Sequence, residues 1–293
     1  MDVSSDDSVQ ALSARLLADM DSFTNSERRV CRAILADYPV SGLESVTTLA
    51  HKSNVSVATV LRLVAKLGFM GFPQFQAALR TELSERLRSP LAQYALQPPS
   101  HTESAYSRSQ EFITSSIVQT FRRLKPEAID EAVMLLTDPR ARVYLVGGRF
   151  SANISNYLAS HLQHMRPGVV AVSEVPIQRN ASLLEIRRRD VVVAFDFRRY
   201  QRDTIEFGRH AAERGAKLLL VTDPWLSPLV TSAQLVIAVD TTSPSVFDSY
   251  ASAFAVAETL IAAVADAVDA DHMRKRMKSH DDWTRDLMAA PEV

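Results

Sequence analysis

Several residue types and patterns that would place this chain in a specialised class are scarce or missing. Cys31 is its single cysteine, which excludes an intrachain disulfide and a cysteine cluster around a metal. It lies in an apolar helical run, so we interpret it as a small core residue. The seven histidines show no metal-ligand spacing, and no HExxH motif occurs. We therefore predict no metal and no cofactor.

A catalytic set is also missing from the sequence. Four glutamates could act as acid or base only in principle, namely Glu174, Glu206, Glu213 and Glu258. His161 and His164 lie on one predicted helix, but such residues are more often surface or core histidines than catalysts. We therefore assign no catalytic residue and expect that the protein is not an enzyme.

The chain also has almost no net charge and no run that is typical of a membrane span. The formal net charge of −1 provides no overall attraction to nucleic acid, so any such contact must be local. The acidic N-terminus, MDVSSDDS, lacks the basic-then-apolar order of a signal peptide. The longest apolar run, residues 250–268, is interrupted by Glu258 and Asp266, which favours a buried helix over a membrane span. We expect a cytoplasmic protein without membrane contact.

What is present is the pattern of an ordinary globular chain with about two domains. It has 293 residues, of which 46% are hydrophobic and 23% are charged. Residues 9–90 are helical in pattern throughout, with a capping signature at residues 24–27. Residues 91–125 are interpreted as a linker, rich in proline, serine and glutamine at its start, and a connecting helix. Residues 126–270 are assigned to the second domain and residues 271–293 to a C-terminal tail.

The stretch from Ser45 to Gly71 organises the first domain. Its pattern predicts a short helix over 45–52, a turn at 53–55 and a longer helix over 56–67. One face of the longer helix is an apolar stripe made of Val57, Val60, Leu61, Val64 and Leu67. The opposite face, expected in solvent, carries small or basic residues, namely Ala58, Thr59, Arg62 and Lys66. Such a pair is typical of a helix-turn-helix whose second helix enters the major groove of DNA.

An ordinary amphipathic helix pair is the alternative, and periodicity alone does not decide between the two. Residues 21–91 carry nine Lys or Arg against six Asp or Glu, a local balance of +3, whereas residues 1–20 have a balance of −3. This modest basic excess lies where DNA contact is expected, and it supports the DNA-binding interpretation weakly.

From residue 142 the pattern changes to short continuous apolar runs separated by helical segments. Five of these runs are predicted strands, at residues 143–146, 169–172, 191–195, 218–221 and 235–239. Continuous apolar runs are what a sheet covered on both faces requires, and their spacing leaves room for crossover helices. We predict an α/β domain in which a five-stranded parallel sheet lies between two helical layers.

The loops after the predicted strands carry the candidate ligand-binding residues, because ligands of open α/β sheets lie at the carboxyl ends of the strands. These candidates are Gly147, Gly148, Arg149 and Ser151 after the first strand, Asp196, Arg198 and Arg199 after the third, and Thr222 and Ser227 after the fourth. The glycines would let the backbone approach a ligand, and Ser151 could cap the next helix and bond an anion. Helix capping alone could account for Thr222 and Ser227.

The arginines after the third strand suit a phosphate or a carboxylate, since guanidinium groups pair bidentately with such anions. The alternative is that they are solvated or pair with Asp196 and Asp203. Both interpretations stay open at the level of sequence.

A longer set of residues carries a family resemblance. In the first half it comprises Glu27 to Val30, Leu49-Ala50, Val55-Ser56, Ala58 to Val60, Arg62, Lys66 to Phe69, Gly71-Phe72 and Phe75. In the second half it comprises Gly147, Ser151, Gly215-Ala216, Thr222 and Ser227 to Leu229. With both sets the chain resembles the RpiR family of bacterial transcription regulators, in which a helix-turn-helix precedes a sugar isomerase (SIS) domain. The resemblance implies DNA contacts by Ser56, Thr59 and Arg62 and a phosphate contact by Lys66, and Ala58 on the same helix is a fifth candidate DNA contact.

The loop after the third strand departs from the family pattern. SIS domains usually carry a serine-rich S-x-S-G-x-T phosphate cradle there, and this chain has Asp196, Arg198, Arg199 and Gln201 at its two serines, its glycine and its threonine. Arg149 stands where the first loop normally has a second glycine. Arginines could still hold an anionic ligand, but with a different geometry.

Three functions are therefore weighed. The first is a regulator that binds double-stranded operator DNA as a homodimer or higher homo-oligomer and senses a small anionic metabolite. That metabolite would be a sugar phosphate, another carbohydrate derivative or an acid. The second is a sugar-phosphate isomerase or lyase with an accessory helical domain. The third is a regulator whose SIS-like domain is inert.

Overall fold

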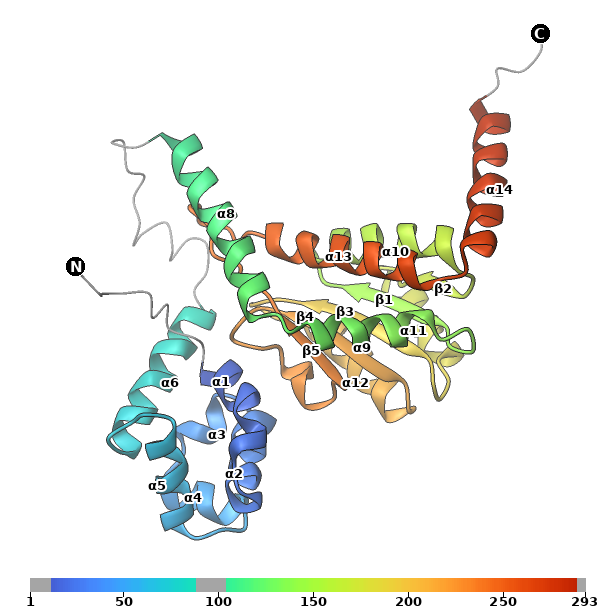
Figure 1. Cartoon of the computed structure of the whole chain (residues 1–293). Coiled ribbons are helices and arrows are strands. Elements are labelled where there is room, and N and C mark those ends of the chain that lie inside the picture. Colours follow the sequence, from blue (N-terminus) through green and yellow to red (C-terminus); the bar gives the residue numbers. More distant parts are fainter. Residues whose placement is uncertain (1–11, 88–103, 289–293) are drawn as a thin grey trace.

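The computed structural model describes residues 12–87 and 104–288, which comprise a helical N-terminal domain and a C-terminal α/β domain (Figure 1). The elements of the first domain are α1 (Leu12–Ala18), η1 (Met20–Ser22), α2 (Asn25–Ala36), α3 (Val40–Leu43), α4 (Val46–Lys52), α5 (Val57–Lys66) and α6 (Phe72–Leu87). No strand occurs among the described residues of this domain, as the sequence predicted. The linker predicted from residue 91 begins outside the described residues.

Local signals account for the helix ends of the first domain. The capping box at the start of α2 is confirmed, because the Thr24 side chain accepts from the Glu27 amide and the Glu27 carboxylate accepts from the Thr24 amide. Ser45 and Ser56 cap the N-termini of α4 and α5 through one bond each, their side chains accepting from the Thr48 and Thr59 amides. The short helix α3, after Pro39, was not predicted from the sequence.

The core of the first domain corrects the predicted orientation of α5. Val60, Val64 and Leu67 are buried as predicted, but Leu61 is 43% exposed and Leu63 is buried in its place. The buried face of α5 is formed by residues 60, 63, 64 and 67. Position 61 lies just outside the edge of this face that is farther from Leu63, and its side chain is therefore exposed. Cys31 lies in this core as a free, buried thiol, as predicted.

Two helices connect the first domain to the sheet. They are α8 (Ala105–Arg123) and α9 (Pro126–Thr137). The first of them is the connecting helix expected within residues 91–125, and it begins at Ala105 because the Ser104 side chain caps it, accepting from the Tyr106 amide at 3.2 Å.

The second domain is built on a five-stranded parallel sheet with the order β2-β1-β3-β4-β5, which confirms the predicted fold class. Its strands are β1 (Val143–Gly147), β2 (Val169–Ala171), β3 (Val191–Asp196), β4 (Lys217–Thr222) and β5 (Leu235–Ala238). The helical elements that follow them are α10 (Ala152–Met165), α11 (Pro176–Glu185), α12 (Arg202–Glu213), η2 (Pro228–Thr231), α13 (Ala251–Ala267) and α14 (Ala270–Met288).

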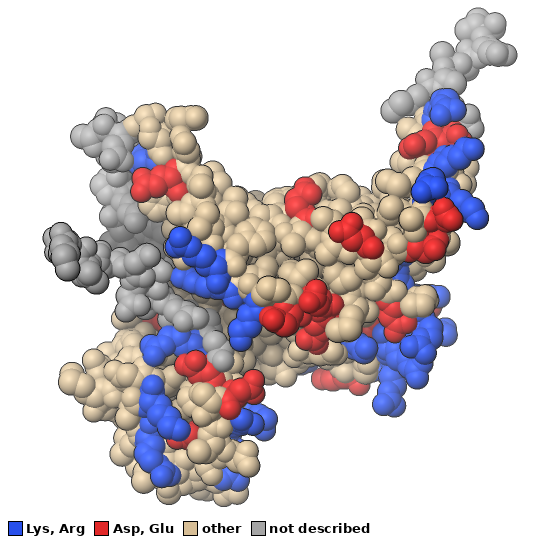
Figure 2. Space-filling model, viewed as in Figure 1, with Lys and Arg blue, Asp and Glu red and all other residues tan. Residues whose placement is uncertain are grey.

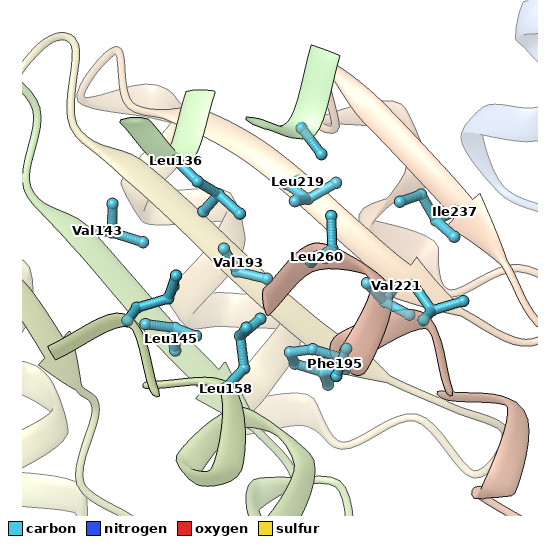
Figure 3. Close-up of a cluster of buried hydrophobic side chains, with 14 of the residues drawn as sticks. Leu136, Val143, Leu145, Leu158, Val193, Phe195, Leu219, Val221, Ile237 and Leu260 are labelled. Atoms are coloured by element: carbon cyan, nitrogen blue, oxygen red, sulfur yellow. The ribbon is translucent and has the colours of Figure 1, made fainter. Parts of the chain in front are cut away.

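Helices cover both faces of this sheet. On one face α9, α10 and α13 pack against inward-pointing strand residues such as Val193, Leu219 and Val221, and Figure 3 shows this cluster with Leu158 and Leu260 from the helices. On the other face α11, α12 and η2 cover the alternate strand residues. The continuous apolar runs of the sequence are therefore strands buried on both sides.

The segment that the sequence assigned to a C-terminal tail is mostly helical. Helix α14 extends away from the end of α13 and packs at its base against α10 (Figure 1). There Arg276 donates to the Gln163 carbonyl at 2.6 Å, and the rings of His164 and His280 lie 4.2 Å apart.

Among the described residues, no single helix has the length and apolar character needed to cross a membrane. Taken together, α13 and α14 reach that threshold by length and composition, but they meet at an angle of 116°.

Candidate functional sites

The helix-turn-helix is formed by α4 and α5, with a turn at residues 53–55. Asn54 has a φ of 50°, a conformation that asparagine tolerates better than most side chains, and it lets the chain reverse between the helices. Gly68 ends the second helix with a φ of 86°. The predicted helix, turn and helix therefore occur at the expected residues.

The solvent face of α5 carries four of the five residues proposed to touch DNA. Ser56, Ala58, Arg62 and Lys66 are exposed. Thr59 is not, since it is 5% exposed, and the prediction that it lies on the solvent face is wrong. Its hydroxyl lies 3.1 Å from the Ser56 hydroxyl and accepts from Arg62 at 3.3 Å. Thr59 therefore helps to orient the side chains of Ser56 and Arg62 on the exposed face.

Lys66 has a partner that the sequence did not reveal. Its ammonium group lies 2.8 Å from the carboxylate of Glu27, which also forms the capping box of α2. Burial raises the pKa of Glu27, but donation from Lys66 and Thr24 outweighs it and leaves the pKa below its ordinary value. The pair joins α2 to the end of α5.

The basic character of this domain is local. In Figure 2, Lys and Arg side chains interleave with Asp and Glu on the visible face of the N-terminal domain. Leu61, which the sequence predicted to be a core residue, adds an exposed apolar side chain to α5. DNA contact on this helix would therefore combine one or two cations with apolar and hydroxyl groups.

The second candidate site is a cavity of about 200 Å³ at the carboxyl ends of β1 and β3. Its lining residues are Gly148, Arg149, Phe150, Ser151, Asp196, Phe197, Arg198, Arg199, Gln201 and Tyr250. Six of the nine predicted effector residues therefore meet here. The other three, Gly147, Thr222 and Ser227, do not line it.

The hydroxyl groups near this cavity are engaged by the protein itself. Ser151 was expected to cap α10 and bond an anion, but its hydroxyl donates to the Phe195 carbonyl and accepts from the Gly148 amide. Ser227 donates to the buried carboxylate of Asp196, and the Thr222 hydroxyl accepts from the Ser227 amide. These side chains hold the ends of the strands through hydrogen bonds within the protein.

The arginines after β3 have separate roles. Arg198 forms a buried ion pair with Asp248 and lies over the ring of Trp225, with its guanidinium carbon 5.4 Å from the ring centroid. The sequence had offered Asp196 and Asp203 as its alternative partners. Arg199 is exposed and has a φ of 66°. The exposed Arg149, which lies over Phe150, supplies a second cation to the same cavity.

Gln201 and Arg179 complete the site, although neither was predicted from the sequence as a site residue. The Gln201 side chain accepts from the Arg149 amide at 2.7 Å and fills the space beside Gly148. Arg179 is buried beneath the first loop, where it donates to the Gly147 and Ser173 carbonyls and pairs with Asp203. Arg179 lies within a predicted helix, and no sequence signal distinguishes it.

The candidate acids and bases do not gather at this cavity. None of Glu174, Glu206, Glu213 and Glu258 lines it, and neither do His161 and His164. Glu258 instead accepts from the Tyr157 hydroxyl, which raises the pKa of that tyrosine.

Both halves of the chain match known families. Residues 11–86 match the helix-turn-helix domain of the rpiR family, and residues 135–265 match the SIS domain. The HTH-type transcriptional regulator HexR of Escherichia coli K12 is 25% identical over 226 residues, which are 77% of this chain and 76% of HexR. An uncharacterized HTH-type transcriptional regulator of Clostridium perfringens is 25% identical over 210 residues, 70% of this chain and 73% of that protein.

Solved structures share the fold. The sugar isomerase domain of an RpiR transcription factor from Sphaerobacter thermophilus has a TM-score of 0.54 and 24% identity, and the match covers 61% of this chain and 99% of that one. The NanR protein of Vibrio vulnificus, solved in complex with ManNAc-6P, has a TM-score of 0.54 and 20% identity over 95% of this chain and all of NanR. The chain therefore belongs to the RpiR family of helix-turn-helix transcriptional regulators, with an SIS domain as its C-terminal half.

Proposed function

We propose that α5 is the recognition helix and that the protein binds double-stranded operator DNA as a homodimer or higher homo-oligomer in the cytoplasm. The observation that carries this proposal is the division of α5 into a buried face and an exposed face with Ser56, Ala58, Arg62 and Lys66. Arg62 can reach a base edge or a phosphate, and the exposed Leu61 can contact a thymine methyl group. Residues 9–90 would then act as the DNA-binding domain, and residues 126–270 would carry oligomerisation and ligand binding.

A pair of substitutions with the same change in charge tests this assignment. Arg62→Ala should lower affinity for DNA from upstream of the protein's own gene by about tenfold or more in a gel-shift titration. Arg140→Ala removes one exposed positive charge from the second domain and should leave affinity within about twofold. Equal affinity of Arg62→Ala and the unsubstituted protein would reject α5 as the recognition helix.

We further propose that the cavity at the ends of β1 and β3 binds a small anionic metabolite through Arg149 and Arg199. These two exposed arginines line the cavity, whereas Arg198 is held by Asp248. NanR binds a phosphosugar within the same fold, and this supports a phosphosugar or a related acid here. Because Ser151, Thr222 and Ser227 are engaged with protein groups, guanidinium groups would hold the anion in place of a hydroxyl cradle.

A thermal-shift screen of phosphosugars and organic acids tests the effector site. A ligand should raise the melting temperature of the protein, and Arg149→Ala/Arg199→Ala should abolish that increase. Arg202→Ala is the control, because Arg202 is exposed on α12 and does not line the cavity. If no compound stabilises the protein, or the double variant responds normally, the SIS domain does not sense anions at this site.

An isomerase or lyase is the second candidate, since residues 135–265 match the SIS domain. We propose that this domain does not catalyse such a reaction, because the carboxylate in the cavity, Asp196, accepts from Ser227 and from the Gln201 amide. Turnover of aldose and ketose phosphates by the purified protein would overturn this proposal.

A further inference from the structure

The DNA-binding domain touches the SIS domain beside the loop that follows β4. The Ser13 hydroxyl of α1 donates to the Pro224 carbonyl at 3.1 Å, and Ser13 is fully buried. Leu17, one helical turn later, packs against both domain cores and lines a cavity together with Pro224 and Leu226. Helix α1 therefore contributes one hydrogen bond and one apolar anchor to this contact, and α2 lies against η2 (Pro228–Thr231) beside it.

The same loop is bound on its other side to the effector cavity. Asp223 is fully buried, and its carboxylate accepts from the Arg198 amide, the Tyr200 hydroxyl and the Trp225 amide. Arg198 lines the cavity and also lies over the Trp225 ring. Asp223 thus joins the loop after β3 to the residues on either side of Pro224.

From these contacts we propose that residues 223–226 couple the effector cavity to the position of the DNA-binding domain. The connection has few steps. A displacement of Arg198 or Tyr200 moves Asp223 through their hydrogen bonds to its carboxylate. Pro224 follows Asp223 in the chain and moves with it, and its carbonyl moves the Ser13 hydroxyl that donates to it. Coupling of this kind needs a physical element that both sites bias, and here it is a single tight turn closed by donation from the Leu226 amide to the Asp223 carbonyl. The inference rests on the proposed effector function of the cavity.

The interface between the domains has room for movement. A cavity of about 310 Å³ lies between Leu17, the Pro224 to Leu226 segment and the junction of α8 and α9. This cleft is open to solvent, and of the residues that line it only Leu17 belongs to the first domain, so that domain can shift there without breaking many close contacts. The hydrogen bond from Ser13 to Pro224 and the packing of Leu17 would then favour one position of the DNA-binding domain among several.

A distance measurement between the two domains tests the proposal without ligand or DNA. Met70 in the first domain and Met134 on α9 are 94% and 67% exposed, so cysteines placed there accept spin labels. The native Cys31 does not interfere, because burial raises the pKa of its thiol to about 12 and it is inaccessible. Labelled full-length chains are diluted with unlabelled chains so that only distances within one chain are recorded.

The variants separate the two ends of the connection. Tyr200→Phe removes one bond to Asp223 and does not alter a residue that lines the cavity, whereas Ser13→Ala removes the bond between the domains. Each should broaden the single distance distribution or add a second one, and the double variant should add little to either. Tyr106→Phe, an exposed tyrosine on α8, should change nothing. Asp223→Asn is a second variant that should act in the same direction as Tyr200→Phe.

Two results would overturn the coupling. In one, Ser13→Ala alters the distances while Tyr200→Phe and Asp223→Asn do not, so the contact exists but is not connected to the cavity. In the other, no variant alters them. The distance measurements use no ligand, so they test the coupling alone. A failure of the effector proposal is detected separately, by the thermal-shift screen.

Discussion

The ammonium group of Lys66 lies 2.8 Å from the carboxylate of Glu27, across 39 residues of sequence, and ties the end of α5 to the start of α2. Because the same carboxylate also closes the capping box with Thr24, one buried group serves two helices. The position of the proposed recognition helix thus depends on a residue at the N-terminus of another helix.

Glu27→Gln should destabilise the N-terminal domain by about 1–3 kcal/mol, because it removes the charge that Lys66 and two Thr24 donors engage. The pKa of Glu27 is lower in the folded protein than in the unfolded chain. Its stabilisation is therefore complete above the ordinary value of 4.5 and is lost as the pH falls through the lower, folded pKa. Urea titrations at several pH values measure this, with the exposed Asp37→Asn as the control. Equal pH dependence in Glu27→Gln and the unsubstituted protein would contradict the prediction.

Gly147→Ala should be more damaging than Gly148→Ala, although the two glycines are adjacent. A Cβ on Gly147 would lie 2.5 Å from the backbone nitrogen of Ala152, whereas on Gly148 it would lie 2.7 Å from the end of the Gln201 side chain. Backbone cannot move aside as a side chain can, so we expect a loss of about 1 kcal/mol for Gly148→Ala and more for Gly147→Ala. Chemical denaturation measures both. Gln201→Ala should restore stability to Gly148→Ala only, and equal rescue of both would refute the explanation.

Asp248→Asn should destabilise the SIS domain by about 3 kcal/mol, because it leaves the buried guanidinium of Arg198 without its anionic partner. Arg198→Met/Asp248→Leu should recover most of this loss, since it removes both charges from the interior. Asp271→Asn, which breaks the exposed pair with Arg274 on α14, is the control and should leave the denaturation midpoint unchanged. A midpoint for Asp248→Asn equal to that of the control would show that the pair contributes nothing.

The contact between α14 and α10 should weaken in acid. Burial lowers the pKa of His164, the neighbouring His280, His161 and Arg276 lower it further, and Asp281 opposes them. A base whose pKa is lowered on folding stabilises the protein above its unfolded value of about 6.5, and this contribution is lost as the pH falls below it. Melting temperatures between pH 8 and 5.5 measure the loss. His280→Gln should weaken the dependence of the melting temperature on pH. His51→Gln, which changes an exposed histidine of the first domain, should not. The reverse result would show that the His164–His280 pair is not the source of the pH dependence.

Helix ends and strands were predictable because their causes are local. Ser56 caps α5 and Gly68 ends it through groups within four residues, and the apolar runs of β1 and β3 follow from burial on both faces. Periodicity was less reliable for the orientation of α5. It assigned Leu61 to the core and Thr59 to solvent, and the packing of the domain reversed both.

The sequence by itself therefore determined the order of elements, the helix-turn-helix and the loops in which a ligand site could form. Only the tertiary structure decided which side chains in those loops are available. Lys66 meets Glu27 and Arg198 meets Asp248 because packing brings distant segments together, and Ser151 is bound to the end of β3 for the same reason. Helix-capping hydrogen bonds and periodicity act within about one helical turn and can be read from the sequence, whereas pairs between distant segments depend on how whole elements pack.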